Sequence, residues 1–278
     1  MEQALGIIAG NGRLPLLVAA GARKAGRRVV VVGLRGLASR RLPASADEFA
    51  WAGLTRLGRW IRLLRRAGAS EAVMIGGVRK RDMYLPLRLL RYIPDLRTAL
   101  LWYCKLRKDK RDNAVLLATA EELAGEGIRL VSSVEYLHEH LAAEGVMTRT
   151  PVPASAAADV EFGWRIARAS ADLDIGQAVA VKERDIIAVE AMEGTDEMIR
   201  RAGQLCRVGG WTLVKVARPN QDLRFDVPTV GPATIRNLRD NGCACLVLEA
   251  ERTILADNPA TLALADELKI AVVGKRPE

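Results

Sequence analysis

The stretch Leu5-Gly6-Ile7-Ile8-Ala9-Gly10-Asn11-Gly12-Arg13-Leu14-Pro15 decides the fold of the first half of this 278-residue chain. An apolar run ends at two glycines, and a helical pattern follows as far as about Ala25. A second buried strand, Arg28–Leu34, comes next along the chain. Strand, loop, helix and strand in this order predict parallel strands joined by a right-handed crossover. The first half is therefore expected to be a Rossmann-like parallel sheet with helices.

The second half carries a different pattern and predicts a mixed sheet. The apolar runs Ala178–Val181 and Ile186–Glu190 are separated by a short charged turn, which is typical of an antiparallel hairpin. Between the two halves, residues 145–158 have the Thr- and Pro-rich composition of a linker. The sequence thus predicts an α/β protein of two domains. These are a Rossmann-like domain over residues 1–144, a linker over 145–158 and a catalytic mixed-sheet α/β domain over 159–278.

Composition excludes several classes of protein. Half of the residues are hydrophobic and the charged fraction is ordinary, which indicates a globular core rather than disorder. No apolar stretch reaches the roughly 18 residues of a membrane span, and no signal peptide precedes the first strand. We therefore expect a cytoplasmic protein that adheres to the inner membrane at most peripherally. The four cysteines have neither metal-ligand nor disulfide spacing, which argues against a zinc site.

The net charge of +9 favours an anionic partner: nucleic acid, an anionic lipid surface or a phosphorylated small molecule. Arg and Lys are concentrated in residues 56–66 and 79–111, and within 83–110 leucines, tyrosines and a tryptophan lie between them. Such a segment can lie at a membrane surface, although core-packing helices with outward arginines produce the same pattern. Nucleic acid is not expected, because aromatic residues are few and no nucleic-acid-binding signature is present.

Two glycine loops are candidate phosphate-binding sites. Gly10, Asn11 and Gly12 follow the first strand, and Gly76-Gly77 follows the strand Glu71–Ile75, with Lys80 among the cations behind it. Glycines let the backbone approach a phosphate, and a helix N-terminus offers free N–H groups. A tight structural turn explains the first loop equally well.

The first glycine loop does not complete a dinucleotide-binding fingerprint. Pro15 replaces its third glycine, and Arg35 stands where an acid would hold the ribose. NAD is therefore disfavoured, and an NADP-dependent oxidoreductase stays as one alternative function.

Acidic residues gather after two strands of the second half. Helix capping explains Thr195 and Asp196 but leaves Glu190 and Glu193 unexplained. The apolar run Trp211–Ala217 leads into a polar stretch that holds Gln221, Asp222, Arg224 and Asp226. Mg²⁺ typically takes one or two protein carboxylates plus phosphate oxygens. Its candidate ligands here are Asp222, Asp226, Glu193 and Asp196, while Arg224 and Lys215 would neutralise phosphate charge.

Together these motifs resemble the UDP-2,3-diacylglucosamine pyrophosphatases of lipid A biosynthesis, the magnesium-using type that is distinct from the metallophosphoesterase type. The likeness runs nearly from end to end and is carried by Gly6–Pro15, Asp174–Val179, Ala188–Asp196 and Gln221–Thr234. It implies a two-domain α/β enzyme that hydrolyses UDP-2,3-diacylglucosamine to UMP and 2,3-diacylglucosamine 1-phosphate. It also implies attack of water on the sugar-linked phosphorus, and we expect the site to lie in a cleft between the domains.

The resemblance further implies a catalytic aspartate within Gln221–Asp226, which is Asp226 or Asp222, and we prefer Asp226. Arg224 is expected to assist it. The residues expected to bind substrate are Gly10, Asn11, Gly12, Gly76, Gly77, Lys80, Gln221, Thr195 and Lys215. The expected partners are the lipid-linked UDP-sugar and an anionic inner-membrane surface, and the sequence leaves a homodimer open. The second alternative is a non-enzymatic protein that binds lipid or a membrane surface.

Overall fold

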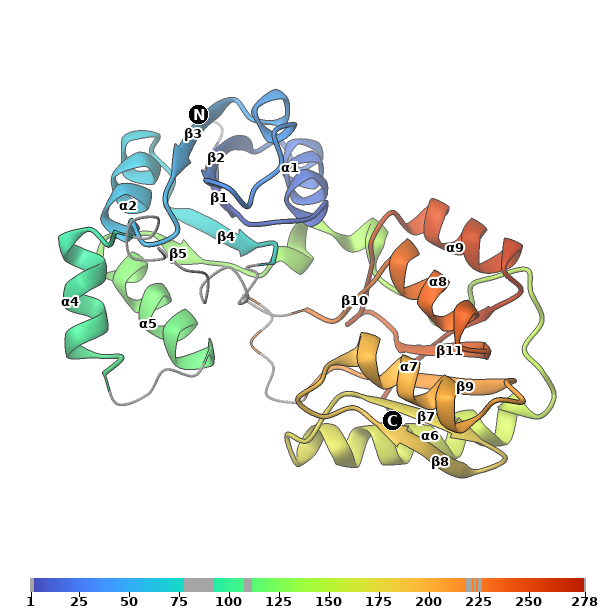
Figure 1. Cartoon of the computed structure of the whole chain (residues 1–278). Helices are drawn as coiled ribbons and strands as arrows, with labels where there is room; N and C mark the ends of the chain where they lie inside the picture. The colour runs from blue at the N-terminus through green and yellow to red at the C-terminus, as the bar shows by residue number, and fades with distance from the viewer. Residues whose placement is uncertain are drawn as a thin grey trace. The chain divides into compact units, whose positions relative to one another are not determined.

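In the computed structural model the chain forms two compact units (Figure 1). The first is built mainly from Met1–Leu137, and the second comprises His138–Asp222 and Asp226–Glu278. The structure describes residues 3–77, 93–107, 112–218, 222, 224 and 227–277. Within these ranges, every helix is too short or too polar to span a bilayer.

The first unit is built around a parallel five-stranded sheet in the order β3-β2-β1-β4-β5. Its strands are β1 (Ala4–Ala9), β2 (Arg28–Leu34), β3 (Glu48–Ala52), β4 (Glu71–Ile75) and β5 (Arg129–Leu130). The chain moves outward from β1 to β3 and then returns to place β4 on the other side of β1. This reversal of strand order confirms the predicted Rossmann-like sheet.

Helices cover both faces of this sheet (Figure 1). Alternate strand residues such as Ile8 and Val32 pack with Trp60 and Leu64 on the face that α2 covers. The opposite face carries α1, with the 3₁₀ turn η1 beside it. The helical segments of this unit are α1 (Leu14–Lys24), η1 (Leu42–Ser45), α2 (Leu57–Arg66), α4 (Leu96–Cys104), α5 (Asp112–Gly125) and η3 (Ser133–Tyr136).

The second unit is built around a six-stranded mixed sheet in the order β6-β13-β11-β9-β7-β8. Its three central strands β13, β11 and β9 are parallel, while β6 and β7 run antiparallel to their neighbours, as predicted for a mixed sheet. The strands are β6 (Gly145–Val146), β7 (Ala178–Lys182), β8 (Asp185–Val189), β9 (Trp211–Lys215), β11 (Cys243–Glu249) and β13 (Ala271–Lys275). A small parallel pair, β10 (Thr229–Val230) and β12 (Ile254–Leu255), lies outside this sheet.

Helices also cover both faces of the second sheet. Trp164 and Ala167 of α6 pack on one face with Val179 and Val214, while Met198 and Ile235 belong to the core on the other face. The helical segments of this unit are η4 (His138–His140), α6 (Ala156–Asp172), α7 (Thr195–Leu205), α8 (Pro232–Asp240) and α9 (Asn258–Glu267).

Two segments differ from the sequence-based expectation. The pattern of Val134–Leu141 predicts a helix, but the structure has the two short 3₁₀ segments η3 and η4 there, and Ser132 Oγ accepts from Val134 N at the start of η3. Residues 145–158, expected to be a linker, contain β6 and the start of α6. Thr150 N donates to Asp266 Oδ1 over 2.8 Å, so this stretch is bonded to α9 of the second unit.

Candidate functional site

The glycine loops after β1 and β4 meet where the strand order of the first unit reverses. Gly10 N donates to Ile75 O over 2.8 Å. Asn11 and Gly77 exchange two backbone hydrogen bonds, of 2.9 Å and 3.0 Å. Ligands of open α/β sheets bind outside the carboxyl ends of the strands at such a reversal. The structure therefore brings five of the expected substrate-binding residues together, whereas Lys80 lies outside the described residues.

The glycines of this edge divide into two kinds. A Cβ atom on Gly10 would lie 2.6 Å from Gly76 O, and one on Gly76 would lie 2.7 Å from Asn11 O. These two glycines allow the loops to approach each other. Added Cβ atoms on Gly12 and Gly77 would meet nothing within 4 Å, so these two positions border open space.

Helix α1 begins directly after this edge. The side chain of its N-cap residue, Arg13, makes no capping hydrogen bond, and Pro15 lies in the first turn. Pro15 has no N–H, and Leu16 N and Leu17 N both donate to Arg13 O, so α1 offers an anion the positive end of its dipole rather than a row of free amides.

The two kinds of glycine predict effects of very different size when a methyl group is added. Gly76→Ala is expected to destabilise the chain by about 1–3 kcal/mol, because residue 76 has a φ of +100° and its Cβ would collide with backbone. Gly77→Ala is expected to change stability by less than about 0.5 kcal/mol. Urea unfolding of both variants measures this difference. Equal destabilisation by the two substitutions would contradict the division.

A buried polar chain lies at the carboxyl ends of β8 and β9 in the second unit. Lys215, the last residue of β9, is 6% exposed, and Glu190, just after β8, is 7% exposed. Lys215 Nζ donates to Thr195 Oγ1 over 2.7 Å, and Thr195 Oγ1 donates to Glu190 Oε1 over 3.0 Å. Thr195 opens α7, so two strand ends and one helix start hold the three groups together.

The second carboxylate oxygen of Glu190 is buried and has no hydrogen-bond partner among the residues that the structure describes. A buried acceptor without a donor costs about 1–3 kcal/mol, so native structures rarely keep one without a reason. A water molecule, a donor group of a ligand or a hard cation would satisfy this oxygen. We therefore take Glu190, Thr195 and Lys215 as the candidate site of the second unit and call them the Glu190 cluster.

The other carboxylates expected to bind metal are placed differently. Glu193 accepts from Ala191 N over 3.1 Å and forms an ion pair with Arg201. Hydrogen bonds from its own backbone N–H and from Arg201 hold the pKa of Glu193 below its ordinary value. Asp196 lies in the first turn of α7. Within the described part of the chain, no three His, Cys, Asp or Glu side chains gather closely enough to hold a metal ion.

The loop after β9 carries the remaining expected residues. Asp222 and Arg224 are half-buried, while Gln221 and Asp226 lie outside the described residues. The start of this loop is anchored by Glu249, which is fully buried and accepts from Ala217 N over 2.7 Å.

Sequence reasoning missed Glu249. Arg168 and Arg252 each donate to its carboxylate, at 3.2 Å in the shortest contacts. The sequence feature that could have indicated this residue is a glutamate at the end of the apolar strand Cys243–Glu249. Its role is to fix where the polar loop leaves the sheet, since one carboxylate joins β9, α6 and the residues after β11.

The fold and these sites define a two-unit α/β protein with a glycine-lined edge in a Rossmann-like unit and a buried carboxylate cluster in a mixed-sheet unit. The family model of the LpxI N-terminal domain matches residues 4–140, and that of the LpxI C-terminal domain matches residues 143–273. The chain is also 33% identical to the UDP-2,3-diacylglucosamine pyrophosphatase LpxI of Caulobacter vibrioides, over 99% of this chain and 98% of that protein. The chain belongs to the LpxI family, which confirms the resemblance inferred from its motifs.

Proposed function

We propose that this chain hydrolyses the pyrophosphate bond of UDP-2,3-diacylglucosamine, giving UMP and 2,3-diacylglucosamine 1-phosphate in lipid A biosynthesis. The observation that carries the proposal is family membership over the whole chain. Both LpxI domains match in order, and the relative named as a UDP-2,3-diacylglucosamine pyrophosphatase aligns from end to end.

The Glu190 cluster supplies groups that this reaction needs. Hydrolysis of a diphosphate requires an oriented water and neutralisation of charge on the phosphate oxygens. The second oxygen of Glu190 can accept a hydrogen bond from such a water. The buried ammonium group of Lys215 is linked to the same carboxylate through the hydroxyl of Thr195. The N-terminus of α7 adds free amides, because its N-cap residue is Gly194. We propose Asp226, or else Asp222, as the essential aspartate, with Arg224 beside it in the chain.

The same donors fit a hard divalent cation. A buried carboxylate oxygen without a partner is the kind of ligand Mg²⁺ takes, and substrate phosphates complete its shell. We propose that Glu190 holds Mg²⁺ together with Asp222 or Asp226, whereas Glu193 is engaged with Arg201. When bound, Mg²⁺ would neutralise the diphosphate and polarise its P–O bonds.

Hydrolysis in ¹⁸O-labelled water tests the proposal and the point of attack. The water oxygen forms a new bond to the sugar-linked phosphorus, and the bond from that phosphorus to the bridging oxygen breaks, so UMP leaves with the bridging oxygen. We expect UMP release that chelation of Mg²⁺ abolishes, with the label in 2,3-diacylglucosamine 1-phosphate. Absence of UMP release with Mg²⁺ or Mn²⁺ would overturn the activity. Label in UMP would keep the activity and overturn the point of attack.

Other expectations stay predictions. These are a site between the domains, a cytoplasmic location with peripheral contact to the inner membrane, and a homodimer. If the chain were an NADP-dependent oxidoreductase, the alternative function, nicotinamide absorbance would co-purify with it. If the chain were a non-enzymatic lipid-binding protein, the second alternative, it would bind lipid tightly without releasing UMP.

A further inference from the structure

Helix α2 carries an exposed stripe of arginines. Arg59, Arg62 and Arg66 are spaced by three and four residues, so they lie on one side of the helix, while Trp60 and Leu64 are buried on the other. None of these three arginines forms an ion pair with another residue in the described ranges. An unpaired guanidinium stripe presents positive charge directly to the solvent and to anything that approaches it.

Helix α4 carries an exposed apolar stripe. Leu96, Leu100 and Tyr103 are 76%, 54% and 67% exposed and are spaced by four and three residues. The buried Leu101 already provides the contact of this helix with the core. Large apolar side chains on the outer side of a helix that is packed on its inner side indicate an interaction surface.

The two helices are fixed to each other at their N-termini. Asp95 accepts from Thr98 N over 2.9 Å and from Arg59 N over 3.2 Å. Thr98 Oγ1 in turn accepts from Leu57 N over 3.0 Å. One short motif therefore caps both α2 and α4, which holds their stripes in a defined arrangement.

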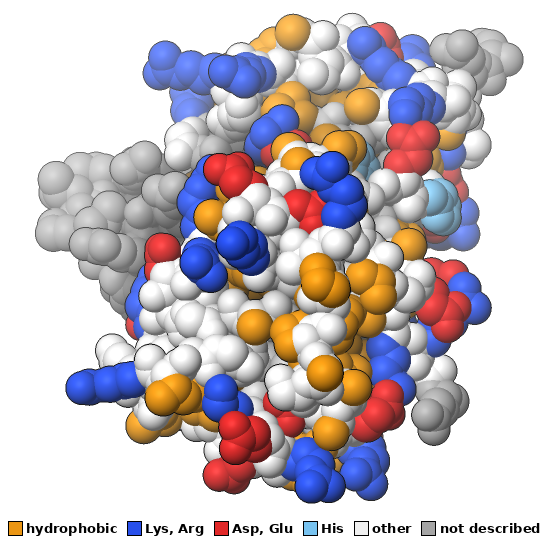
Figure 2. Space-filling model, turned by 90° about the vertical axis from the view of Figure 1, so that its right-hand side faces the viewer, with side chains coloured by type: hydrophobic (Ala, Val, Ile, Leu, Met, Phe, Trp, Pro, Cys, Tyr) orange, Lys and Arg blue, Asp and Glu red, His pale blue; other side chains and the backbone are white. Residues whose placement is uncertain are grey.

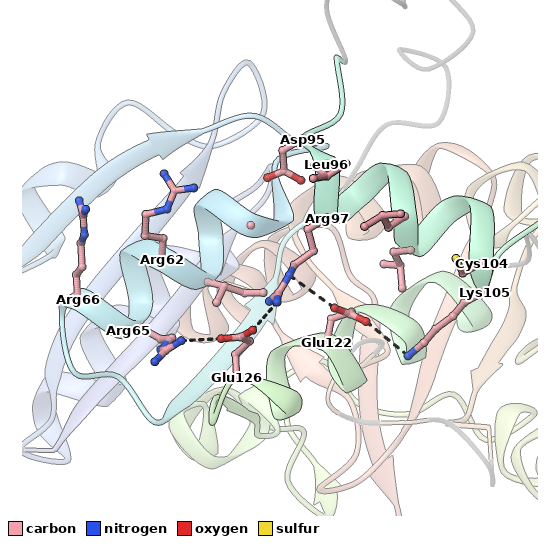
Figure 3. A pocket seen from close by; sticks show the side chains of 14 residues that line it. Arg62, Arg65, Arg66, Asp95, Leu96, Arg97, Cys104, Lys105, Glu122 and Glu126 are labelled. Atoms are coloured by element: carbon pink, nitrogen blue, oxygen red, sulfur yellow. Dashed lines mark hydrogen bonds and ion pairs between the residues drawn. The ribbon is translucent and has the colours of Figure 1, made fainter.

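Both stripes border one groove. It has a volume of about 970 Å³, and Arg62, Arg66, Leu96 and Leu100 are among its lining residues (Figure 3). We call the two stripes with this groove the α2/α4 face. Residues 83–92 and 108–110 of the basic segment singled out in the sequence lie outside the described residues.

The net charge of this groove is positive. Its five lining cations exceed its three carboxylates. Glu126 is paired with Arg65 and Arg97, and Glu122 lies 3.6 Å from Lys105 (Figure 3). Because the carboxylates are engaged, the charge that faces outward is that of Arg62 and Arg66. By contrast, Lys and Arg side chains are interspersed with Asp and Glu side chains on the face that Figure 2 draws.

We propose that the α2/α4 face docks the protein on anionic phospholipid. Its arginines would contact headgroup phosphates, and its leucines and tyrosine would enter the boundary of the acyl chains. Charge complementarity favours an anionic surface. The exposed leucines favour a lipid over a nucleic acid, because a phosphodiester backbone gives them nothing apolar to contact. The inference stands on this surface and does not depend on the proposed hydrolysis.

Sedimentation of the full-length chain with vesicles tests the proposal. One set of vesicles holds equal parts of phosphatidylglycerol and phosphatidylcholine, and the other holds phosphatidylcholine alone. We expect binding to the first set only, and we expect replacement of all three stripe arginines by Gln to lower the binding constant roughly a hundredfold at low salt. The matched control removes three exposed arginines of the second unit and should stay within about threefold. Its substitutions are Arg165→Gln, Arg184→Gln and Arg239→Gln.

A second variant tests the apolar stripe. Leu96→Ser, Leu100→Ser and Tyr103→Ser together are expected to remove the binding that persists at high salt, because burial of apolar groups is not screened. Turnover of a water-soluble short-chain UDP-diacylglucosamine should be unchanged in both stripe variants. Absence of that turnover in the wild-type chain would count against the proposed function, not against the membrane surface. Failure of the wild-type chain to bind the anionic vesicles, or equal losses in the stripe and control variants, would overturn the proposal.

Discussion

Replacing Glu190 by Gln is expected to lower kcat by about 10²- to 10⁴-fold. The amide keeps an oxygen that can accept from Thr195 Oγ1, so the hydrogen-bond chain from Lys215 can persist. The substitution removes the negative charge of the carboxylate. We propose that the second oxygen of this carboxylate binds a water molecule or a metal ion. Steady-state UMP release measures the loss, and thermal unfolding checks that the fold is retained.

A role in metal binding predicts a second change in the same variant. The Mg²⁺ concentration for half-maximal activity should rise in Glu190→Gln, a change that a purely structural glutamate would not produce. Glu193→Gln is the matched control. Its carboxylate is paired with Arg201 of α7, so kcat and the Mg²⁺ requirement should stay near wild type. Wild-type turnover in a folded Glu190→Gln variant would remove this residue from the mechanism.

Replacing Asp226 by Asn is expected to lower kcat by about a thousandfold, and Asp222→Asn is expected to have a much smaller effect. The two substitutions each remove one negative charge from the loop after β9, so they are matched to each other. The reason for the asymmetry is the role proposed for Asp226 in activating water or holding Mg²⁺. Turnover of the two purified variants under saturating substrate measures it.

The opposite ranking would assign the essential role to Asp222 and leave the rest of the mechanism unchanged. Near wild-type turnover in both variants would show that the loop contributes no essential carboxylate. Thermal unfolding of both proteins distinguishes a catalytic loss from a folding defect.

The sheets were predictable because buried strands and their connections are local patterns. Arg28–Leu34 is continuously apolar after its first residue, and the glycine loop before it marks a strand-to-helix turn. The strand β3 was missed, since Glu48–Ala52 contains no β-branched residue and is recognised only by its pairing with β2. The short 3₁₀ segments around Ser133–His140 have the apolar spacing of a helix without its length.

The candidate site was predictable only in part. The glycine loops were found because each follows a strand in the sequence. Which carboxylates form the site could not be predicted, because that depends on contacts between different helices and strands. Arg201 forms an ion pair with Glu193, and Lys215 at the end of β9 is linked to Glu190 through Thr195. The α2/α4 face shows the same limit, since the sequence does not tell that Arg65 and Arg97 beside it pair with Glu126, just after α5.

The joined loops of Gly10 and Gly76 have a consequence for how this protein should be surveyed by mutagenesis. Their shape is produced by main-chain bonds and by the absence of side chains. An alanine scan, which truncates side chains and passes over glycines, would report this edge as silent. Only substitutions that add atoms, such as Gly76→Ala, would reveal it, so a scan that leaves Gly10, Gly12, Gly76 and Gly77 unchanged carries no information about their importance.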